Sequence, residues 1–98
     1  MKGFHQIHPD TVVELGKRVI IDHLEDLMRL HQVDPKTVVF RWEHGPVYSR
    51  WFLRIYKVEL ELTLKFMEAD VVEWSMRGEV ASKYATDMLT VIERLKKE

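Results

Sequence analysis

The 98-residue chain contains no cysteine. A disulfide scaffold, a thiolate metal site and a cysteine nucleophile are therefore excluded, which suits the reducing cytosol. The sequence also lacks any run approaching the roughly 18 apolar residues of a membrane-spanning helix, and its first residues lack the apolar core of a secretory signal. We expect a soluble, cytoplasmic protein that forms one domain over residues 1–98 and has no membrane partner.

Neither sign of charge dominates, because the formal net charge is −1. A balance this close to zero gives no argument by itself for a nucleic-acid or membrane partner. The positive charge is nevertheless concentrated. Residues 35–57 carry five Lys or Arg against one Asp or Glu, whereas the segments before and after them are net acidic. We therefore expect a basic region around the first half of the predicted sheet.

Turn-forming residues are scarce in the middle of the chain, where no Gly, Pro or Asn occurs in the 31 residues between Pro46 and Gly78. Within this span, residues 58–66 alternate apolar and polar side chains with a period of two. Such alternation is typical of a strand with one buried and one solvated face. Residues 37–43 alternate in the same way, and we interpret residues 69–76 as a third strand.

The alternation changes phase at residues 56–57. Before this point the apolar side chains occupy odd-numbered positions, and after it they occupy even-numbered ones. The odd-numbered set is Trp51, Leu53 and Ile55. A β-bulge or a hairpin turn must absorb the slip, because a shift of one residue reverses the facing of every later side chain. Two-residue hairpin loops favour Gly, Asn or Asp, which residues 56–57 lack. The sequence therefore favours one long bent strand over residues 47–66, whose unpaired edge would pair with another chain.

Two helices are expected, one before and one after the strands. Residues 11–14 have the Thr-x-x-Glu form of a capping box, so the first helix should begin near Thr11 and end before Pro35. Its apolar arc is wider than a solvent-facing helix needs, which predicts a further contact beside the sheet. Residues 81–95 carry apolar side chains at helical spacing and predict the second helix.

These elements predict an α+β fold in which a helix, a three-stranded antiparallel meander and a second helix follow one another. Both helices are expected on one face of the sheet. The alternative is a four-stranded meander with a true turn at residues 56–57.

No catalytic, metal or cofactor motif occurs in the sequence, so we do not expect an enzyme. Five histidines are many for this length, but His5 and His8 have no carboxylate at ligand spacing. His23 and His31 fall within the apolar arc of the first helix. We interpret them as imidazoles that pack and form hydrogen bonds at the margin of the core, with metal or proton chemistry as the alternative.

One set of side chains combines aromatic rings with guanidinium groups on the strand face opposite the apolar one. Its members are Arg41, Tyr48, Arg50, Phe52, Arg54 and Tyr56. Protein interfaces favour Tyr, Phe and Arg, while rings beside arginines can also stack on unpaired bases, and a third interpretation is that a helix covers them. We expect a small non-enzymatic protein that binds and masks or adapts another protein, as a homodimer. The alternative is a single-stranded nucleic-acid-binding protein that uses the same six residues.

Overall fold

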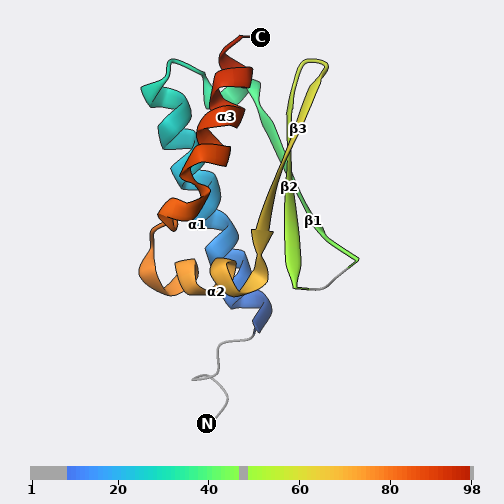
Figure 1. The fold of residues 1–98 in the computed structure, drawn as a ribbon, viewed down its shortest axis with the longest axis vertical. Coiled ribbons are helices and arrows are strands. Elements are labelled where there is room, and N and C mark those ends of the chain that lie inside the picture. Colours follow the sequence, from blue (N-terminus) through green and yellow to red (C-terminus); the bar gives the residue numbers. More distant parts are fainter. Residues whose placement is uncertain (1–8, 47–48, 98) are drawn as a thin grey trace.

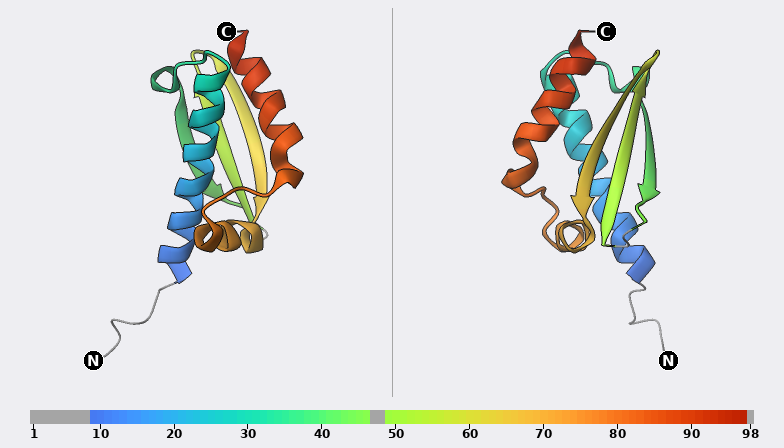
Figure 2. Two further views of the ribbon diagram at one scale, coloured as in Figure 1. Left: turned by 90° about the vertical axis from the view of Figure 1, so that its left-hand side faces the viewer. Right: turned by 45° about the vertical axis from the view of Figure 1, so that its right-hand side comes forward.

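The computed structural model describes residues 9–46 and 49–97. Its main elements are helix α1 (Pro9–Leu30), strands β1 (Val39–His44), β2 (Arg50–Lys57) and β3 (Leu60–Met67), helix α2 (Glu68–Arg77) and helix α3 (Ala85–Lys96). The strands form one antiparallel sheet in the order β1-β2-β3, and α1 and α3 cover the same face of it (Figures 1 and 2). The predicted α+β class, with a three-stranded meander and the terminal helices on one face, is confirmed.

Helix α1 begins at Pro9, two residues before the predicted start. Proline suits this position because the first N–H groups of a helix have no partner within it. The helix ends through Gln32, which has a left-handed φ of 65°, while the N–H of Val33 donates to the carbonyl of Met28 at 2.7 Å. This is a Schellman motif, so the helix stops before Pro35 can interrupt it.

Strands β1 and β2 show the predicted faces. Phe40 pairs with Ile55 and Trp42 pairs with Leu53. Leu53 and Ile55 are fully buried, and the two aromatic residues pack partly buried against the core. Because successive side chains of a strand point to opposite faces, the rows that carry the arginines point away from the helices.

The predicted long bent strand is wrong, because β2 and β3 are separate strands joined by a tight hairpin. Val58 and Glu59 form the loop between the paired residues Lys57 and Leu60. Val58 has a φ of 55°, a left-handed conformation that β-branched residues rarely adopt. The loop thus contains neither the glycine nor the asparagine that such hairpins favour. The change of phase is a real turn, two residues beyond the position of the predicted alternative.

The predicted strand over residues 69–76 is also wrong, because this segment belongs to helix α2. Val71 and Trp74, three positions apart, are its buried residues, whereas Met76 is 78% exposed. Gly78 follows the last turn with a left-handed φ of 73°, as is common at helix ends. Adjacent valines favour a strand locally, but the helical spacing is what allows this segment to bury its apolar residues.

The strands are similar in length, at six, eight and eight residues. No strand therefore extends far beyond its neighbours, and the part of the homodimer prediction that depended on an overlong strand does not hold. The sheet does have two free edges, formed by β1 and β3.

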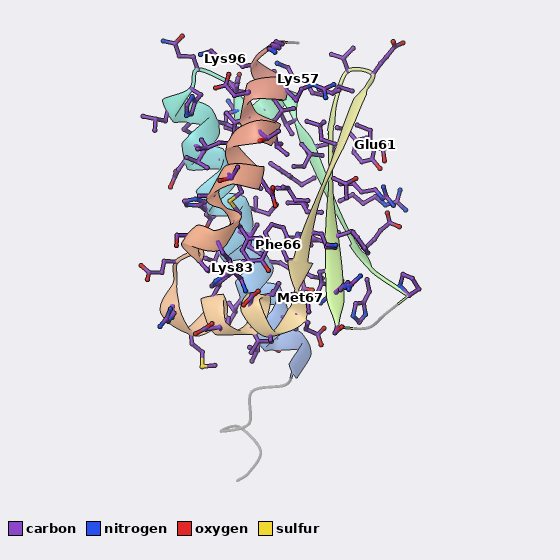
Figure 3. All side chains as sticks on the ribbon, viewed as in Figure 1. Lys57, Glu61, Phe66, Met67, Lys83 and Lys96 are labelled. Atoms are coloured by element: carbon purple, nitrogen blue, oxygen red, sulfur yellow. The ribbon has the colours of Figure 1, made fainter. Side chains whose placement is uncertain are left out.

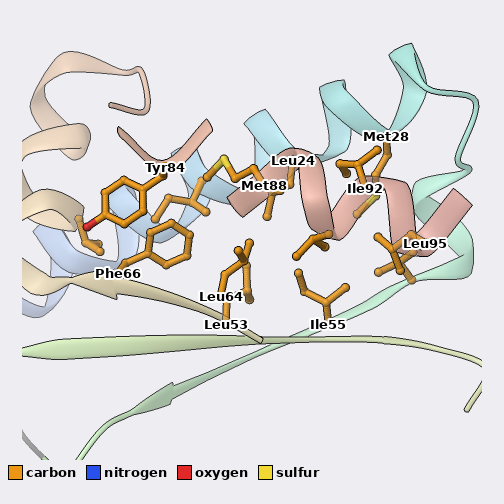
Figure 4. Close-up of a cluster of buried hydrophobic side chains, with 14 of the residues drawn as sticks. Leu24, Met28, Leu53, Ile55, Leu64, Phe66, Tyr84, Met88, Ile92 and Leu95 are labelled. Atoms are coloured by element: carbon orange, nitrogen blue, oxygen red, sulfur yellow. The ribbon is translucent and has the colours of Figure 1, made fainter. Parts of the chain in front are cut away.

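The hydrophobic core fills the space between the sheet and the helices (Figure 4). At one end of it, the rings of Phe66, Trp74 and Tyr84 lie with their centroids 5.0 to 5.6 Å apart. Edge-on and tilted contacts of this kind are favoured by aromatic pairs. They join β3, α2 and the residue that precedes α3.

Helix α2 supplies the further contact that the wide apolar arc of α1 predicted. The two helices approach each other at Gly16, where an added Cβ would lie 1.9 Å from the carbonyl oxygen of Val71. Only glycine allows the backbones to come this close.

Candidate functional site

One face of the sheet points away from the helices and is covered by no part of the chain that the structure describes (Figures 1 and 2). We call it the outer face. It is formed by Val39, Arg41, Glu43, Arg50, Phe52, Arg54, Tyr56, Glu61, Thr63, Lys65 and Met67. Figure 3 shows that side chains of β3 point to both faces of the sheet: Glu61 points away from the helices and Phe66 points toward them.

Five of the six predicted site residues lie on the outer face. They are Arg41, Arg50, Phe52, Arg54 and Tyr56. Tyr48, the sixth, lies outside the described residues. The sheet places Arg41 directly opposite Arg54, and it leaves Phe52 and Tyr56 half-buried although no described helix covers them.

Arg54 occupies the middle of the outer face and links all three strands. Its Nε donates to the carboxylate of Glu43 on β1, and its Nη1 lies 3.1 Å from the carboxylate of Glu61 on β3. The hydrogen bond from Arg54 is the main reason that the pKa of Glu43 is lowered, and the same bond raises the pKa of Arg54. This guanidinium therefore stabilises the sheet, because its Nε and Nη1 have acceptors on β1 and β3.

The other cations of the outer face differ from Arg54. Within the described ranges, Arg41, Arg50 and Lys65 form no ion pair with a carboxylate. The whole face carries four cations and two carboxylates. It is thus basic, and Arg41 and Arg50, which form no close ion pair in the described ranges, can donate to a carboxylate or a phosphate of a partner.

The ring of Phe52 is held in place by the turn that follows β1. An added Cβ at Gly45 would lie 2.6 Å from Cε2 of this ring, so the ring fills the space that the glycine leaves. The N–H of Gly45 also donates to the carbonyl of Arg50 at 3.1 Å. The role of Gly45 in placing Phe52 depends on the pairing of β1 with β2, which no local sequence pattern reveals.

A second polar cluster, which the sequence analysis missed, lies on the inner side of the sheet. Lys17 of α1 is only 9% exposed, and its Nζ lies 3.6 Å from the centroid of the Trp51 ring and 2.9 Å from Glu14. Trp51 in turn stacks on His44 with centroids 4.2 Å apart and donates to Glu68 at 2.8 Å. These contacts tie α1 and α2 to the sheet, and we assign the cluster a structural role.

The histidines form no metal site in the part of the chain that the structure describes, where no three His, Asp or Glu side chains come together to hold an ion. His31 is half-buried, and its Nδ1 lies 4.0 Å from Glu93. His23 is exposed and borders a surface pocket beside Val80, so its predicted place at the core margin is wrong. The remaining pair, His5 and His8, lies outside the described residues.

Over residues 9–46 and 49–97, no helix combines the length and the apolar character needed to cross a bilayer. Comparison of the chain with models of known protein families, with curated proteins and with solved structures finds no match. The outer face is therefore the basis on which we infer a function.

Proposed function

We propose that this chain is a small, non-enzymatic, cytoplasmic protein that binds and masks or adapts another protein through its outer face. The single observation that carries the proposal is a sheet face, uncovered by the described helices, that presents half-buried rings beside guanidinium groups without ion-pair partners. The predicted contact residues are Arg41, Tyr48, Arg50, Phe52, Arg54 and Tyr56.

The composition of the outer face indicates the chemistry of the partner. Phe52 and Tyr56 offer rigid aromatic area of the kind that interface hot spots use. Arg41 and Arg50 can each donate two parallel hydrogen bonds to a carboxylate. We therefore expect a partner surface with a shallow apolar centre and carboxylates at its rim.

The predicted homodimer remains part of this proposal. Two outer faces in contact would bring like charges together, because each carries more cations than carboxylates. Salt should therefore strengthen self-association through this face, by screening that repulsion. Light scattering tests this directly against the monomer mass of 11.7 kDa. A monomer at every salt and protein concentration would remove the homodimer and leave a different protein as the partner.

Site-specific cross-linking in the source cells tests the proposed function. A photoreactive phenylalanine analogue replaces Phe52 in one variant and Asp26, on α1, in a matched control variant. We expect a discrete cross-linked protein from position 52 only, and its loss when Arg41 and Arg50 are both changed to Ala. Equal cross-linking from both positions, or none from position 52, would contradict the proposal.

The excess of cations beside two rings also supports the alternative, a single-stranded nucleic-acid-binding protein. Fluorescence anisotropy with a labelled single-stranded oligonucleotide distinguishes the two. Binding to phosphates should weaken steeply with salt, and Arg50→Ala should reduce the slope of log affinity against log salt by about one. Absence of binding at low salt would eliminate this alternative.

A further inference from the structure

Strand β3 and helix α3 border a groove of about 360 Å³ at the free edge of the sheet. It is lined by Leu62, Thr63, Leu64, Lys65, Asp87, Thr90, Val91 and Arg94. The leucines point toward the helices, as Figure 4 shows for Leu64, and Val91 faces the groove from α3. The groove is thus lined by three apolar side chains, of which Leu62 is the partly exposed one, and by five polar or charged ones.

The free edge of β3 presents unpaired backbone groups to this groove. In a two-residue hairpin the closing pair, here Lys57 and Leu60, exchanges both of its backbone hydrogen bonds, and bonded pairs then recur at every second residue. The N–H of Glu68 follows this pattern at the far end, since it donates to the carbonyl of Ser49 at 2.7 Å. Even-numbered residues of β3 thus bond to β2. The odd-numbered residues, whose N–H and C=O groups point to the edge, are Glu61, Thr63 and Lys65.

The open stretch of this edge ends at Met67. The N–H of Met67 cannot donate to an added strand, because it already donates to the hydroxyl of Tyr84 at 3.3 Å. In the described chain, none of the three preceding odd-numbered residues forms a backbone hydrogen bond beyond the sheet. Three consecutive edge-facing residues of this kind match one added β-strand about five residues long.

A second copy of the chain does not fit this edge. Figure 2 (left) shows α3 running alongside β3 and, at its N-terminal end, passing beyond the edge of the sheet. If two copies paired through β3, each would bring its own α3 to the same place above the junction. Packed helices need about 8–10 Å between their axes, so the two helices would collide. The occupant must be an extended segment with no helix above it.

The side chains along β3 select the sequence of this segment. An antiparallel strand centred on Thr63 places one of its residues opposite Lys65 and another opposite Glu61. An acidic side chain complements Lys65, and a basic side chain complements Glu61. The residues on either side of the central residue lie opposite Leu64 and Leu62. Their side chains point toward the helices and should be apolar. We propose that the groove binds an extended segment of a partner protein with the pattern acidic, apolar, β-branched, apolar, basic as a fourth strand.

Thr63 and Lys65 belong to both the groove and the outer face, but none of the six predicted contact residues lines the groove, so the inference does not depend on the proposed function. A probe is available in the chain itself, because residues 61–65 read Glu-Leu-Thr-Leu-Lys and have the required pattern. The probe is a synthetic peptide of residues 60–66 with blocked ends, Leu-Glu-Leu-Thr-Leu-Lys-Phe. Its matched control exchanges the two charges, Leu-Lys-Leu-Thr-Leu-Glu-Phe, at constant composition.

Titration of the full, isotope-labelled chain with each peptide, followed by nuclear magnetic resonance, tests the inference. We expect saturable shift changes at the amides of Glu61, Thr63 and Lys65. The control peptide should bind about tenfold more weakly, because it places like charges opposite each other at two positions. Absence of saturable changes at these amides, or equal affinity for both peptides, would overturn the proposal.

Exchange of the two charges in the protein provides a second test. The double variant Glu61→Lys with Lys65→Glu should prefer the control peptide by about tenfold, provided that circular dichroism shows the same fold. Arg41→Ala, on strand β1, which β2 separates from β3, should leave peptide affinity within about twofold, which separates the groove from the proposed binding face. An unchanged peptide preference in the double variant would contradict the inferred register. Dimerisation of the unliganded protein that Lys65→Glu abolishes would contradict the exclusion of a second copy.

Discussion

The hydroxyl of Tyr84 donates a hydrogen bond to the carboxylate of Asp70 at 2.5 Å. Tyr84 lies immediately before α3, and Asp70 lies in the first turn of α2. The same hydroxyl accepts the N–H of Met67, the last residue of β3, and Lys83 pairs with the carboxylate at 2.9 Å. One tyrosine therefore joins the end of the sheet to both C-terminal helices.

Removal of this hydroxyl should destabilise the fold. Tyr84→Phe keeps the ring in the core but leaves the N–H of Met67 without its acceptor and the carboxylate of Asp70 with Lys83 as its remaining partner. We expect the free energy of unfolding to fall by about 1–3 kcal/mol, measured by urea denaturation with tryptophan fluorescence. Tyr56→Phe, on the outer face, is the matched control and should change it by less than about 0.5 kcal/mol. Equal effects of the two substitutions would show that the hydroxyl contributes nothing.

The pH dependence of stability should report on Asp70. Burial acts to raise the pKa of this carboxyl, but the hydrogen bond from Tyr84 and the ion pair with Lys83 together hold the pKa below its ordinary value of 3.8. A lowered folded-state pKa contributes stability above the ordinary value, and that contribution is lost as the pH falls through the folded-state pKa. Asp70→Asn should therefore be less stable than the natural protein at pH 7, and the difference should shrink in acid. Urea denaturation of both proteins from pH 7 to pH 3 measures it, and a constant difference would contradict the assignment.

Substitution of Gly16 should lower the stability of the fold, although glycine inside a helix is usually less stable than alanine. Helix propensity alone favours alanine over glycine by about 1 kcal/mol. The added Cβ would, however, meet the carbonyl oxygen of Val71 at 1.9 Å, and a backbone atom cannot move aside as a side chain can. Overpacking of this kind costs about 1–3 kcal/mol or more, so we expect Gly16→Ala to lower the free energy of unfolding by about 2 kcal/mol. Arg18→Ala, at an exposed site of the same helix, is the control and should have little effect. An increase in stability on Gly16→Ala would show that α1 and α2 are not in close contact.

The hairpin between β2 and β3 should become more stable when Val58 is replaced by glycine. Val58 is 87% exposed, so little buried area is lost, and its φ of 55° costs a β-branched residue about 1–2 kcal/mol. The greater flexibility of glycine in the unfolded chain offsets about half of that gain. We expect Val58→Gly to raise the free energy of unfolding by about 0.5–1 kcal/mol. Glu59→Gly, the neighbouring control, should lower it, because Glu59 has no positive φ to relieve. The same sign for both substitutions would contradict the described turn.

The faces of β1 and β2 could be predicted because they depend on a local rule. Successive side chains of a strand alternate between faces whatever the strand pairs with, so the burial of Leu53 and Ile55 and the outward direction of Arg41 and Arg50 follow from spacing alone. The same rule placed five predicted site residues on one face. The alternation of residues 58–66 likewise predicted an extended segment, which β3 largely confirms, although not as a strand of its own.

Tertiary contacts decided what local preference could not. Val58 accepts an unfavourable backbone conformation because the turn lets β3 pair with β2 along its whole length. Residues 69–76, with adjacent valines, form a helix because only that spacing buries Val71 and Trp74 together, against an α1 that Gly16 allows to approach. The bridge from Arg54 to the two outer strands and the groove beside β3 arise from the register and from the position of α3. Alternation is a property of the chain itself, whereas turns, helix contacts and grooves are stabilised by residues far apart in the sequence.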